Sequence, residues 1–200
     1  ESMAEAGART RSRGYAIYVL AILLLVSTLN FIDRIVIGVL AGPIKADLGL
    51  SDTQLGLLGG TAFGLFYAAF GIPIGWLADR SNRVWIMTGA LAFWSVFTAL
   101  CGTAQSFSQL FLARIGVGVS EAGGSAPGYS LISDYFPPSQ RARALAVFSF
   151  GIPIGSGLGL ALGGVITTMV DWRVTFLVLG LFGLLVAPVL RATVREPIRG

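Results

Sequence analysis

The sequence contains no histidine and only one cysteine, Cys101, in 200 residues. Without histidine the chain cannot build Ser-His or Cys-His catalytic pairs or the usual zinc sites, and a single cysteine cannot form an internal disulfide or a CxxC metal motif. Charged residues are also scarce, at 12% of the chain, where soluble globular domains carry roughly 25%. These absences argue against an enzyme, a resident metal or cofactor, and a soluble fold.

Long apolar runs take the place of the missing charge, since 54% of the residues are hydrophobic and the mean hydropathy is +0.79. A helix needs roughly 20 residues to cross about 30 Å of hydrocarbon. Six runs approach that length: 15–42, 53–78, 84–104, 109–135, 142–170 and 174–190. The sequence therefore predicts an all-α polytopic membrane protein. Its predicted parts are a cytoplasmic N-terminal segment (1–14), a six-helix transmembrane bundle (15–190) and a short segment after the last span (191–200).

The placement of basic residues predicts how the bundle is oriented. With a cytoplasmic N-terminus, only Lys45 and Arg173 fall outside, and Arg34 and Arg114 lie within spans. The asymmetry follows the positive-inside rule and predicts a multi-pass protein of a plasma or bacterial inner membrane. It also accounts for the pI near 9.7 without a nucleic-acid partner. The arginines predicted on the cytoplasmic side are Arg9, Arg11, Arg13, Arg80, Arg83, Arg141, Arg143, Arg191, Arg195 and Arg199.

An internal repeat predicts that the six spans form two sets of three. With a shift of eighty residues, RIVIG at 34–38 falls on RIGVG at 114–118, and GIPIG at 71–75 falls on an identical GIPIG at 151–155. Because three is an odd number, two such units must face opposite ways across the membrane. Inverted three-helix repeats of this kind are typical of several secondary transporters.

Four charged residues interrupt the predicted first and fourth spans. Asp33 and Arg34 lie in the first, and Arg114 and Glu121 lie in the fourth, seven residues apart and so near one helical face. Each costs roughly 2.5 to 3.5 kcal/mol near the bilayer centre, and insertion does not require them. Two interpretations are open. The acids and bases neutralise each other, or they face a hydrated cavity in which carboxylates exchange protons and arginines hold an anionic group.

Glycine and proline positions predict how the spans pack. Gly155, Gly159 and Gly163 recur at every fourth residue and predict a ridge that lets another helix approach closely. Capping-box patterns at 51–54 and 106–109 predict helix starts. Prolines that interrupt the predicted spans, where kinks are expected, are Pro73, Pro127, Pro153 and Pro188.

Two stretches resemble motifs of the major facilitator superfamily. GWLADRSNR at 75–83 resembles the loop motif between the second and third spans, with Asn82 where glycine is common. ARIGVGVSEAGG at 113–124 resembles the fourth-span motif. Within the superfamily, FIDRIVIGVL at 31–40 and the run from EAGGSAPG to FPPSQRARAL at 121–145 resemble the Spinster group of lipid transporters, and organic-anion and sugar-acid symporters share the latter.

The resemblance implies roles for individual residues. Asp33 and Glu121 would take up and release protons. Protons would be the coupling ion, and no cofactor is implied. Arg34 and Arg114 would pair with those acids or bind substrate. A cytoplasmic gate would contain Asp79, Arg80 and Arg83. Because family members have twelve spans, the resemblance implies that the chain is an N-terminal half whose partner is a C-terminal six-helix half, and that residues 191–200 are the start of a central cytoplasmic loop.

The leading functional hypothesis is a proton-coupled, alternating-access transporter of amphipathic lipids such as lysophospholipids or sphingosine phosphate. The alternative is a proton-coupled symporter of small organic anions or sugar acids, using the same charged spans. A noncatalytic helical membrane scaffold is a hypothesis of another class, and it leaves the four buried charges unexplained. A lipid carrier needs an apolar cavity wall, for which the aromatic candidates are Phe31, Phe63, Tyr67 and Tyr129.

Overall fold

The computed structural model describes residues 13–169 and 171–198, and this part of the chain is helical without a β-strand. Most of the predicted N-terminal segment, with Arg9 and Arg11, lies outside the described residues, as do Val170 and Arg199. The elements are α2 (Arg13–Val39), α3 (Ala41–Leu48), α4 (Asp52–Gly56), η1 (a π-helical turn, Leu57–Thr61), α5 (Ala62–Arg80), α6 (Arg83–Cys101), α7 (Phe107–Glu121), α8 (Ser125–Tyr135), α9 (Pro138–Ser149), α10 (Gly151–Met169) and α11 (Trp172–Thr193).

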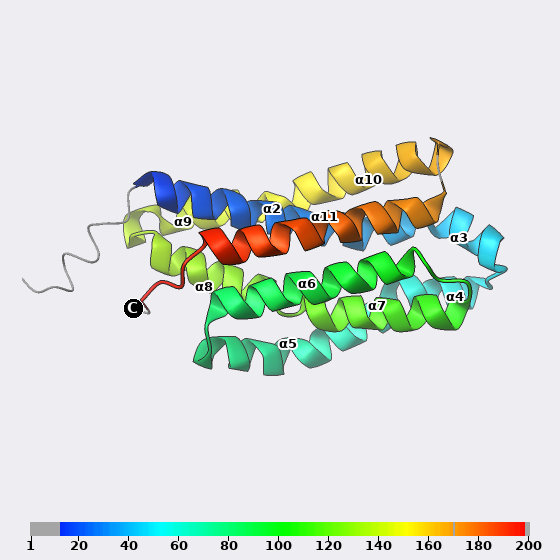
Figure 1. Ribbon diagram of the computed structural model, residues 1–200, viewed down its shortest axis with the longest axis horizontal. Coiled ribbons are helices and arrows are strands. Elements are labelled where there is room, and N and C mark those ends of the chain that lie inside the picture. Colours follow the sequence, from blue (N-terminus) through cyan, green and yellow to red (C-terminus); the bar gives the residue numbers. More distant parts are fainter. Residues whose placement is uncertain (1–12, 170, 199–200) are drawn as a thin grey trace, which may run out of the picture.

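Five stretches of the described residues are long and apolar enough to cross a membrane: α2, α4 to α5, α6, α9 to α10, and α11. The predicted fourth span is divided into α7 and α8, which follow each other along the length of the bundle (Figure 1). Observed ends differ from predicted ones by a few residues. In particular, α2 already begins at Arg13, and α11 continues through the predicted loop start as far as Thr193.

The break between α7 and α8 has a local cause. After Glu121 the backbone closes into tight turns, with the amides of Gly123 and Gly124 donating to the carbonyls of Ser120 and Glu121 at 3.1 and 3.0 Å. Pro127 has no amide hydrogen, so it cannot donate the backbone hydrogen bond to the preceding turn that a continuous helix would need. The predicted kink at Pro127 is therefore observed as a full interruption, and it places Glu121 at the end of a helix.

The two sets of three spans run in opposite directions. Followed from blue to red in Figure 1, the spans of α2, α5 and α6 alternate, and the second set begins with the opposite sense. The eighty-residue register of the repeat is wrong, however. Corresponding spans begin at Arg13 and Phe107, Asp52 and Pro138, and Arg83 and Trp172, so each offset exceeds eighty. Arg34 lies late in α2 and Arg114 early in α7, so the matched pentapeptides are not structural equivalents.

The predicted glycine ridge is confirmed, and it faces α2. A Cβ atom on Gly155 would lie 2.5 Å from the carbonyl oxygen of Thr28, and one on Gly163 would lie 2.9 Å from Val39. A second seam, which the sequence analysis missed, joins α11 to α6, where a Cβ on Gly180 would lie 2.6 Å from the amide of Ala99. Glycine therefore brings two pairs of helix backbones into direct contact.

A polar layer divides the interior into two apolar clusters. One cluster contains the first part of α2 as far as Ile32, with α8, α9 and the end of α11. The other begins at Val36 and contains α3, α7 and the start of α11. Buried Asp33, Thr98 and Glu121 lie between these clusters. The apolar clusters thus enclose these polar side chains within the bundle.

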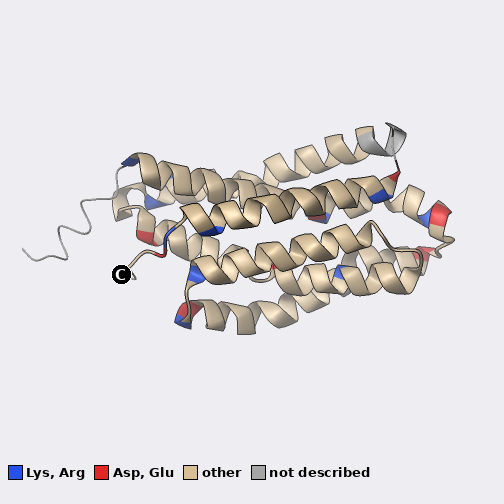
Figure 2. Ribbon diagram, in the orientation of Figure 1, with Lys and Arg blue, Asp and Glu red and all other residues tan. Residues whose placement is uncertain are grey.

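Charged residues outside this layer gather at the two ends of the bundle (Figure 2). Basic residues are more numerous at the end where α2 begins and α11 finishes than at the end that holds α3. This distribution agrees with the one counted from the sequence.

Candidate transport site

Asp33 and Arg114 form a buried ion pair between α2 and α7. Nη1 of Arg114 donates to Oδ2 of Asp33 at 3.2 Å, and the two side chains are 1% and 3% exposed respectively. The hydroxyl of Thr98 on α6 donates to Oδ1 of Asp33 at 2.9 Å. Three helices therefore hold this carboxylate, and each of its oxygens accepts one hydrogen bond.

Arg34 and Glu121 form a second ion pair between the same two helices. Nε of Arg34 donates to Oε2 of Glu121 at 2.9 Å, with the Arg34 side chain 23% exposed and Glu121 fully buried. The Arg34 guanidinium also stacks on aromatic rings, at 4.5 Å from Tyr67 and 5.2 Å from Phe31. Stacking on aromatic faces stabilises a guanidinium that has been removed from water.

The two pairs are adjacent and belong to one cluster. The ring of Phe63 lies 5.2 Å from the Arg34 guanidinium and 5.3 Å from that of Arg114. In each pair the arginine binds the acid of the other helix, so the sequence neighbours Asp33 and Arg34 have different partners. Of the two interpretations left open by the sequence, mutual neutralisation describes the observed pairing. Arg34 also lines a cavity, so the interpretation in which charged groups face a hydrated cavity stays a prediction.

Several buried polar atoms of the cluster have no hydrogen-bond partner in the described part of the chain. They are Nη2 of Arg34, Nε of Arg114 and Oε1 of Glu121. Buried groups of this kind are nearly always satisfied by protein, water or ligand. The cluster therefore retains capacity to bind a polar ligand or water.

A cavity of about 210 Å³ opens beside Arg34. Its polar lining includes Asn30, Arg34 and Ser125, and three of the four predicted aromatic wall residues, Phe31, Tyr67 and Tyr129, also line it. The fourth, Phe63, stacks behind them on Tyr67 with 5.7 Å between the ring centroids. Asp33 and Glu121 do not belong to the lining, so Arg34 stands between the cavity and Glu121.

Asn30 is a candidate site residue that the sequence analysis missed. It is 4% exposed, it lines the cavity, and both its Nδ2 and Oδ1 atoms lack a partner among the described residues. It lies one helical turn before Arg34, on the same face of α2. An uncharged amide hardly alters the hydropathy of a long apolar run, so only its spacing from Arg34 could have indicated it.

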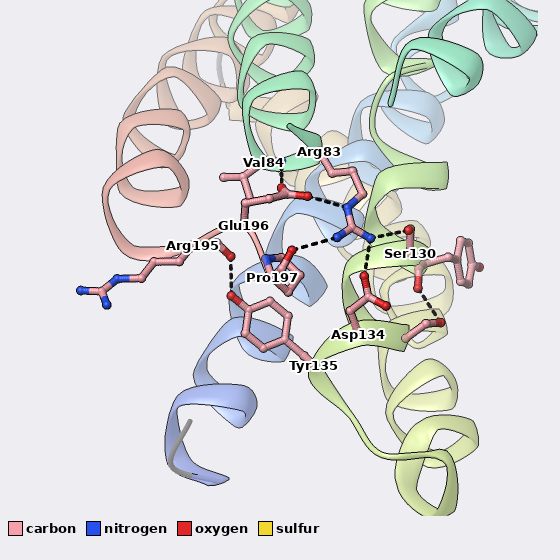
Figure 3. Close-up of polar contacts among 10 residues, drawn as sticks. Arg83, Val84, Ser130, Asp134, Tyr135, Arg195, Glu196 and Pro197 are labelled. Atoms are coloured by element: carbon pink, nitrogen blue, oxygen red, sulfur yellow. Dashed lines mark hydrogen bonds and ion pairs between the residues drawn. The ribbon is translucent and has the colours of Figure 1, made fainter. Parts of the chain in front are cut away.

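Among the predicted gate residues, Arg83 is at the centre of a buried polar cluster (Figure 3). Nε of Arg83 donates to Glu196 at 2.7 Å, and Nη1 donates to Asp134 at 2.6 Å and to Ser130 at 2.7 Å. The other carboxylate oxygen of Glu196 accepts the amide of Val84 at 3.1 Å. One arginine thus ties the start of α6 to α8 and to the segment after α11.

The other two predicted gate residues have a different environment. Asp79 and Arg80 are exposed at the end of α5. The Arg80 guanidinium stacks on the ring of Trp76 at 4.1 Å. The partners of Arg83 in α8 and after α11 could not be inferred from the motif, because they lie far from it in sequence.

A membrane-spanning helical bundle with two oppositely directed sets of three spans, a central charge cluster and an adjoining cavity has the architecture of secondary transporters. The sequence pattern of the Major Facilitator Superfamily matches residues 23–199. The chain belongs to this superfamily, whose members are transporters and not enzymes.

Curated relatives match most of this chain and less than half of their own length. An MFS-type efflux pump of Mycolicibacterium smegmatis is 39% identical over 84% of this chain and 39% of its own length. Protein spinster homolog 1 of Homo sapiens is 35% identical over 94% of the chain and 36% of its own. The probable galactarate/D-glucarate transporter GudP of Bacillus subtilis is 32% identical over 98% of the chain and 44% of its own.

Solved structures confirm the resemblance to the Spinster group. A bacterial homolog of the human lysosomal transporter Spinster, in an inward-facing and unoccupied conformation, superposes with a TM-score of 0.90 and 42% identity. The match covers 94% of this chain and 45% of that one. The chain therefore spans less than half the length of the relatives described here.

Proposed function

We propose that the chain is part of a proton-coupled, alternating-access transporter of amphipathic lipids, with lysophospholipids or sphingosine phosphate as the substrate type. Two Spinster matches, to a human protein and to a solved bacterial structure, support the resemblance to the Spinster group, and that resemblance implies a lipid substrate. The length of the relatives supports a second six-helix half as the partner. The positive-inside asymmetry supports a cytoplasmic N-terminus in a plasma or bacterial inner membrane.

The cavity has the chemistry of an amphipathic ligand. Asn30 and Arg34 provide hydrogen-bond donors, an acceptor and a positive charge on one wall, while Met87, Phe148 and Ile152 provide apolar surface. A phosphate or carboxylate would bind the guanidinium, a hydroxyl or amide would bind Asn30, and an alkyl chain would contact the apolar side chains.

The observation that carries the coupling proposal is the position of Arg34, which binds Glu121 and also lines the cavity. An anionic substrate at Arg34 competes with Glu121 for the same guanidinium. A buried carboxylate that loses its cation is more stable in its neutral form, so Glu121 takes up a proton as substrate binds. Substrate and proton are thereby linked at one arginine.

Asp33 is the second proposed proton site, held by Arg114 and Thr98. Because Phe63 stacks beside both arginines, a shift of Arg34 toward substrate alters the packing around the Asp33 pair. The cytoplasmic gate is proposed to include Asp79, Arg80 and Arg83, which lie at the more basic end of the bundle. The Arg83 cluster would stabilise that end in the conformation seen here.

A second candidate is a proton-coupled symporter of small organic anions or sugar acids. The match to the galactarate/D-glucarate transporter favours it, and Arg34 would bind a carboxylate in the same position.

Uptake by the full-length protein in liposomes separates the two candidates. Labelled lysophospholipid and a labelled sugar acid are offered with and without a pH gradient. The lipid proposal expects gradient-dependent uptake of the lysophospholipid, and uptake of the sugar acid alone would overturn it.

A further inference from the structure

A second hollow, larger than the cavity at Arg34, lies on another face of the bundle between α5, α6 and α7. Its volume is about 570 Å³, and apolar side chains such as Trp85, Phe93 and Phe97 line it. Three glycines also line it, Gly89, Gly116 and Gly123. None of its lining residues lines the cavity at Arg34. We refer to it as the outer groove.

No part of the described chain fills the outer groove at its middle. A Cβ atom on Gly89 would find nothing within 4 Å. A Cβ atom on Gly180 of the neighbouring α11 would instead meet the backbone of α6, because the two helices are in direct contact there. Phe93 and Trp85 beside Gly89 are 65% and 57% exposed. The groove is thus open at its surface, and an apolar occupant would cover these rings.

The groove has the length of one membrane leaflet. Its lining on α6 runs from Trp85, in the first turn of the helix, to Phe97. At the α-helical rise this stretch is about 18 Å long, a little over half of the roughly 30 Å of hydrocarbon in a bilayer. An acyl chain entering near Trp85 would therefore end near the middle of the membrane.

The mouth of the groove carries positive charge. The guanidinium of Arg191, in the last turn of α11, lies 4.3 Å from the ring centre of Trp85. Tryptophan prefers the level of the lipid head groups, and arginine there attracts phosphate. Apolar groove and cationic mouth together match an anionic lipid.

The geometry points to a binding site for one anionic phospholipid, with an acyl chain in the outer groove and its phosphate at Arg191. The lipid is a resident of the leaflet at the basic end of the bundle, and it is not the transported substrate. Val119 and Ser120 line the groove and directly precede Glu121 in the chain. The bound chain would therefore support the end of α7 that carries Glu121.

The test uses the full-length protein in lipid nanodiscs with a phosphatidylglycerol that carries a photoreactive group on its acyl chain. Labelled peptides are mapped by mass spectrometry, and unlabelled phosphatidylglycerol or phosphatidylcholine is added as competitor. Labelling is expected to concentrate on 85–97 and 116–123 and to be displaced better by phosphatidylglycerol. Labelling spread evenly over the exposed helix faces, equal competition by both lipids, or no labelling in the groove would overturn the proposal.

Matched variants separate the groove from the mouth. Gly89→Leu adds a side chain inside the groove, where its Cβ would have no atom within 4 Å, and is expected to reduce labelling there. Gly164→Leu on α10, whose Cβ also has no atom within 4 Å, is not. Arg191→Gln is expected to reduce the preference for phosphatidylglycerol roughly fivefold, the value for one interfacial charge. Arg143→Gln, an exposed arginine on α9, is the charge control. Equal effects of each variant and its control would contradict the site, and thermal unfolding checks that all four remain folded.

Discussion

Arg114 on α7 donates to Asp33 on α2 at 3.2 Å, inside a cluster whose second pair, Arg34 and Glu121, joins the same helices in the opposite sense. Each helix thus contributes one acid and one base, and each charge has its ion-pair partner only when both helices are in place. Removal of one partner from a buried pair leaves an uncompensated charge, which costs far more than the net value of the intact pair.

Arg114→Ala is therefore expected to destabilise the protein by about 3 to 5 kcal/mol, the usual cost of breaking a buried pair. Expression yield and thermal unfolding in detergent measure the loss. Adding Asp33→Asn to the Arg114→Ala variant should recover part of the lost stability, because the carboxylate that Arg114 had paired is then removed as well. Thr98→Val is the milder comparison, at about 1 kcal/mol for one hydrogen bond. A stable Arg114→Ala protein that merely fails to transport would contradict a structural ion pair.

Neutral replacement of the acids is expected to separate coupling from folding. Asp33→Asn and Glu121→Gln keep the shape of each side chain and should abolish gradient-driven uptake. Each leaves an arginine without its carboxylate and so lowers stability, but the protein should remain folded, which thermal unfolding checks. Asp52→Asn replaces an exposed carboxylate at the start of α4 that is paired with Lys45, far from the buried cluster in the fold; it is the control and should transport normally. Unchanged proton dependence in both site variants would refute the coupling role.

Asn30 is expected to affect substrate affinity without supporting the fold. Since both amide atoms lack partners in the described chain, Asn30→Leu should leave stability unchanged or slightly higher. One lost hydrogen bond of about 1 kcal/mol corresponds to a roughly fivefold rise in KM. Transport kinetics and thermal unfolding are measured together. Lower stability with unchanged KM would show that Asn30 is structural.

Two glycines of α10 provide a matched pair for the seam with α2. Gly155→Ala places a methyl group against the Thr28 carbonyl and should cost about 1 to 3 kcal/mol through overpacking. Gly157→Ala meets no atom within 4 Å, and should be neutral or stabilising by up to about 1 kcal/mol from helix propensity. Equal melting temperatures for the two variants would show that the seam tolerates separation.

Arg83→Gln is expected to loosen the cluster in Figure 3. It removes charge-assisted hydrogen bonds to Asp134 and Glu196 and should cost about 2 kcal/mol. Limited proteolysis after α11 should accelerate as Glu196 is released. Arg143→Gln, exposed on the same end, should change neither measurement. Proteolysis at the normal rate in Arg83→Gln would mean that the segment is held by other contacts.

The sequence was sufficient to predict the spans, the two spans that carry charge and the glycine ridge. Each of these is a local pattern, since a charge in a long apolar run or a glycine at every fourth residue is visible without a partner. The partners were not visible. Asp33 directly precedes Arg34 in the chain, yet Asp33 binds Arg114 and Arg34 binds Glu121. Helix rotation and tilt decide which of these side chains meet.

The errors have physical reasons as well. Short matches in Gly- and Ile-rich helices led to a predicted repeat offset of eighty residues. Arg34, however, lies near the end of its span, and Arg114 lies near the start of its own. The fourth span was predicted as one helix because small, uncharged residues continue through the Gly123–Gly124 turn. Both carboxylate partners of Arg83 were missed, since a salt bridge between distant segments leaves no periodic signal.

The two glycine seams constrain how a carrier of this kind can move. One seam joins α2 of the first unit to α10 of the second, and the other joins α6 to α11 in the same crosswise manner. Because the main chains are in direct contact, one three-helix unit cannot rotate against the other without a steric clash. The six spans are interlocked and should travel as a single rigid body, so that any opening and closing takes place at the boundary between this body and whatever packs against it.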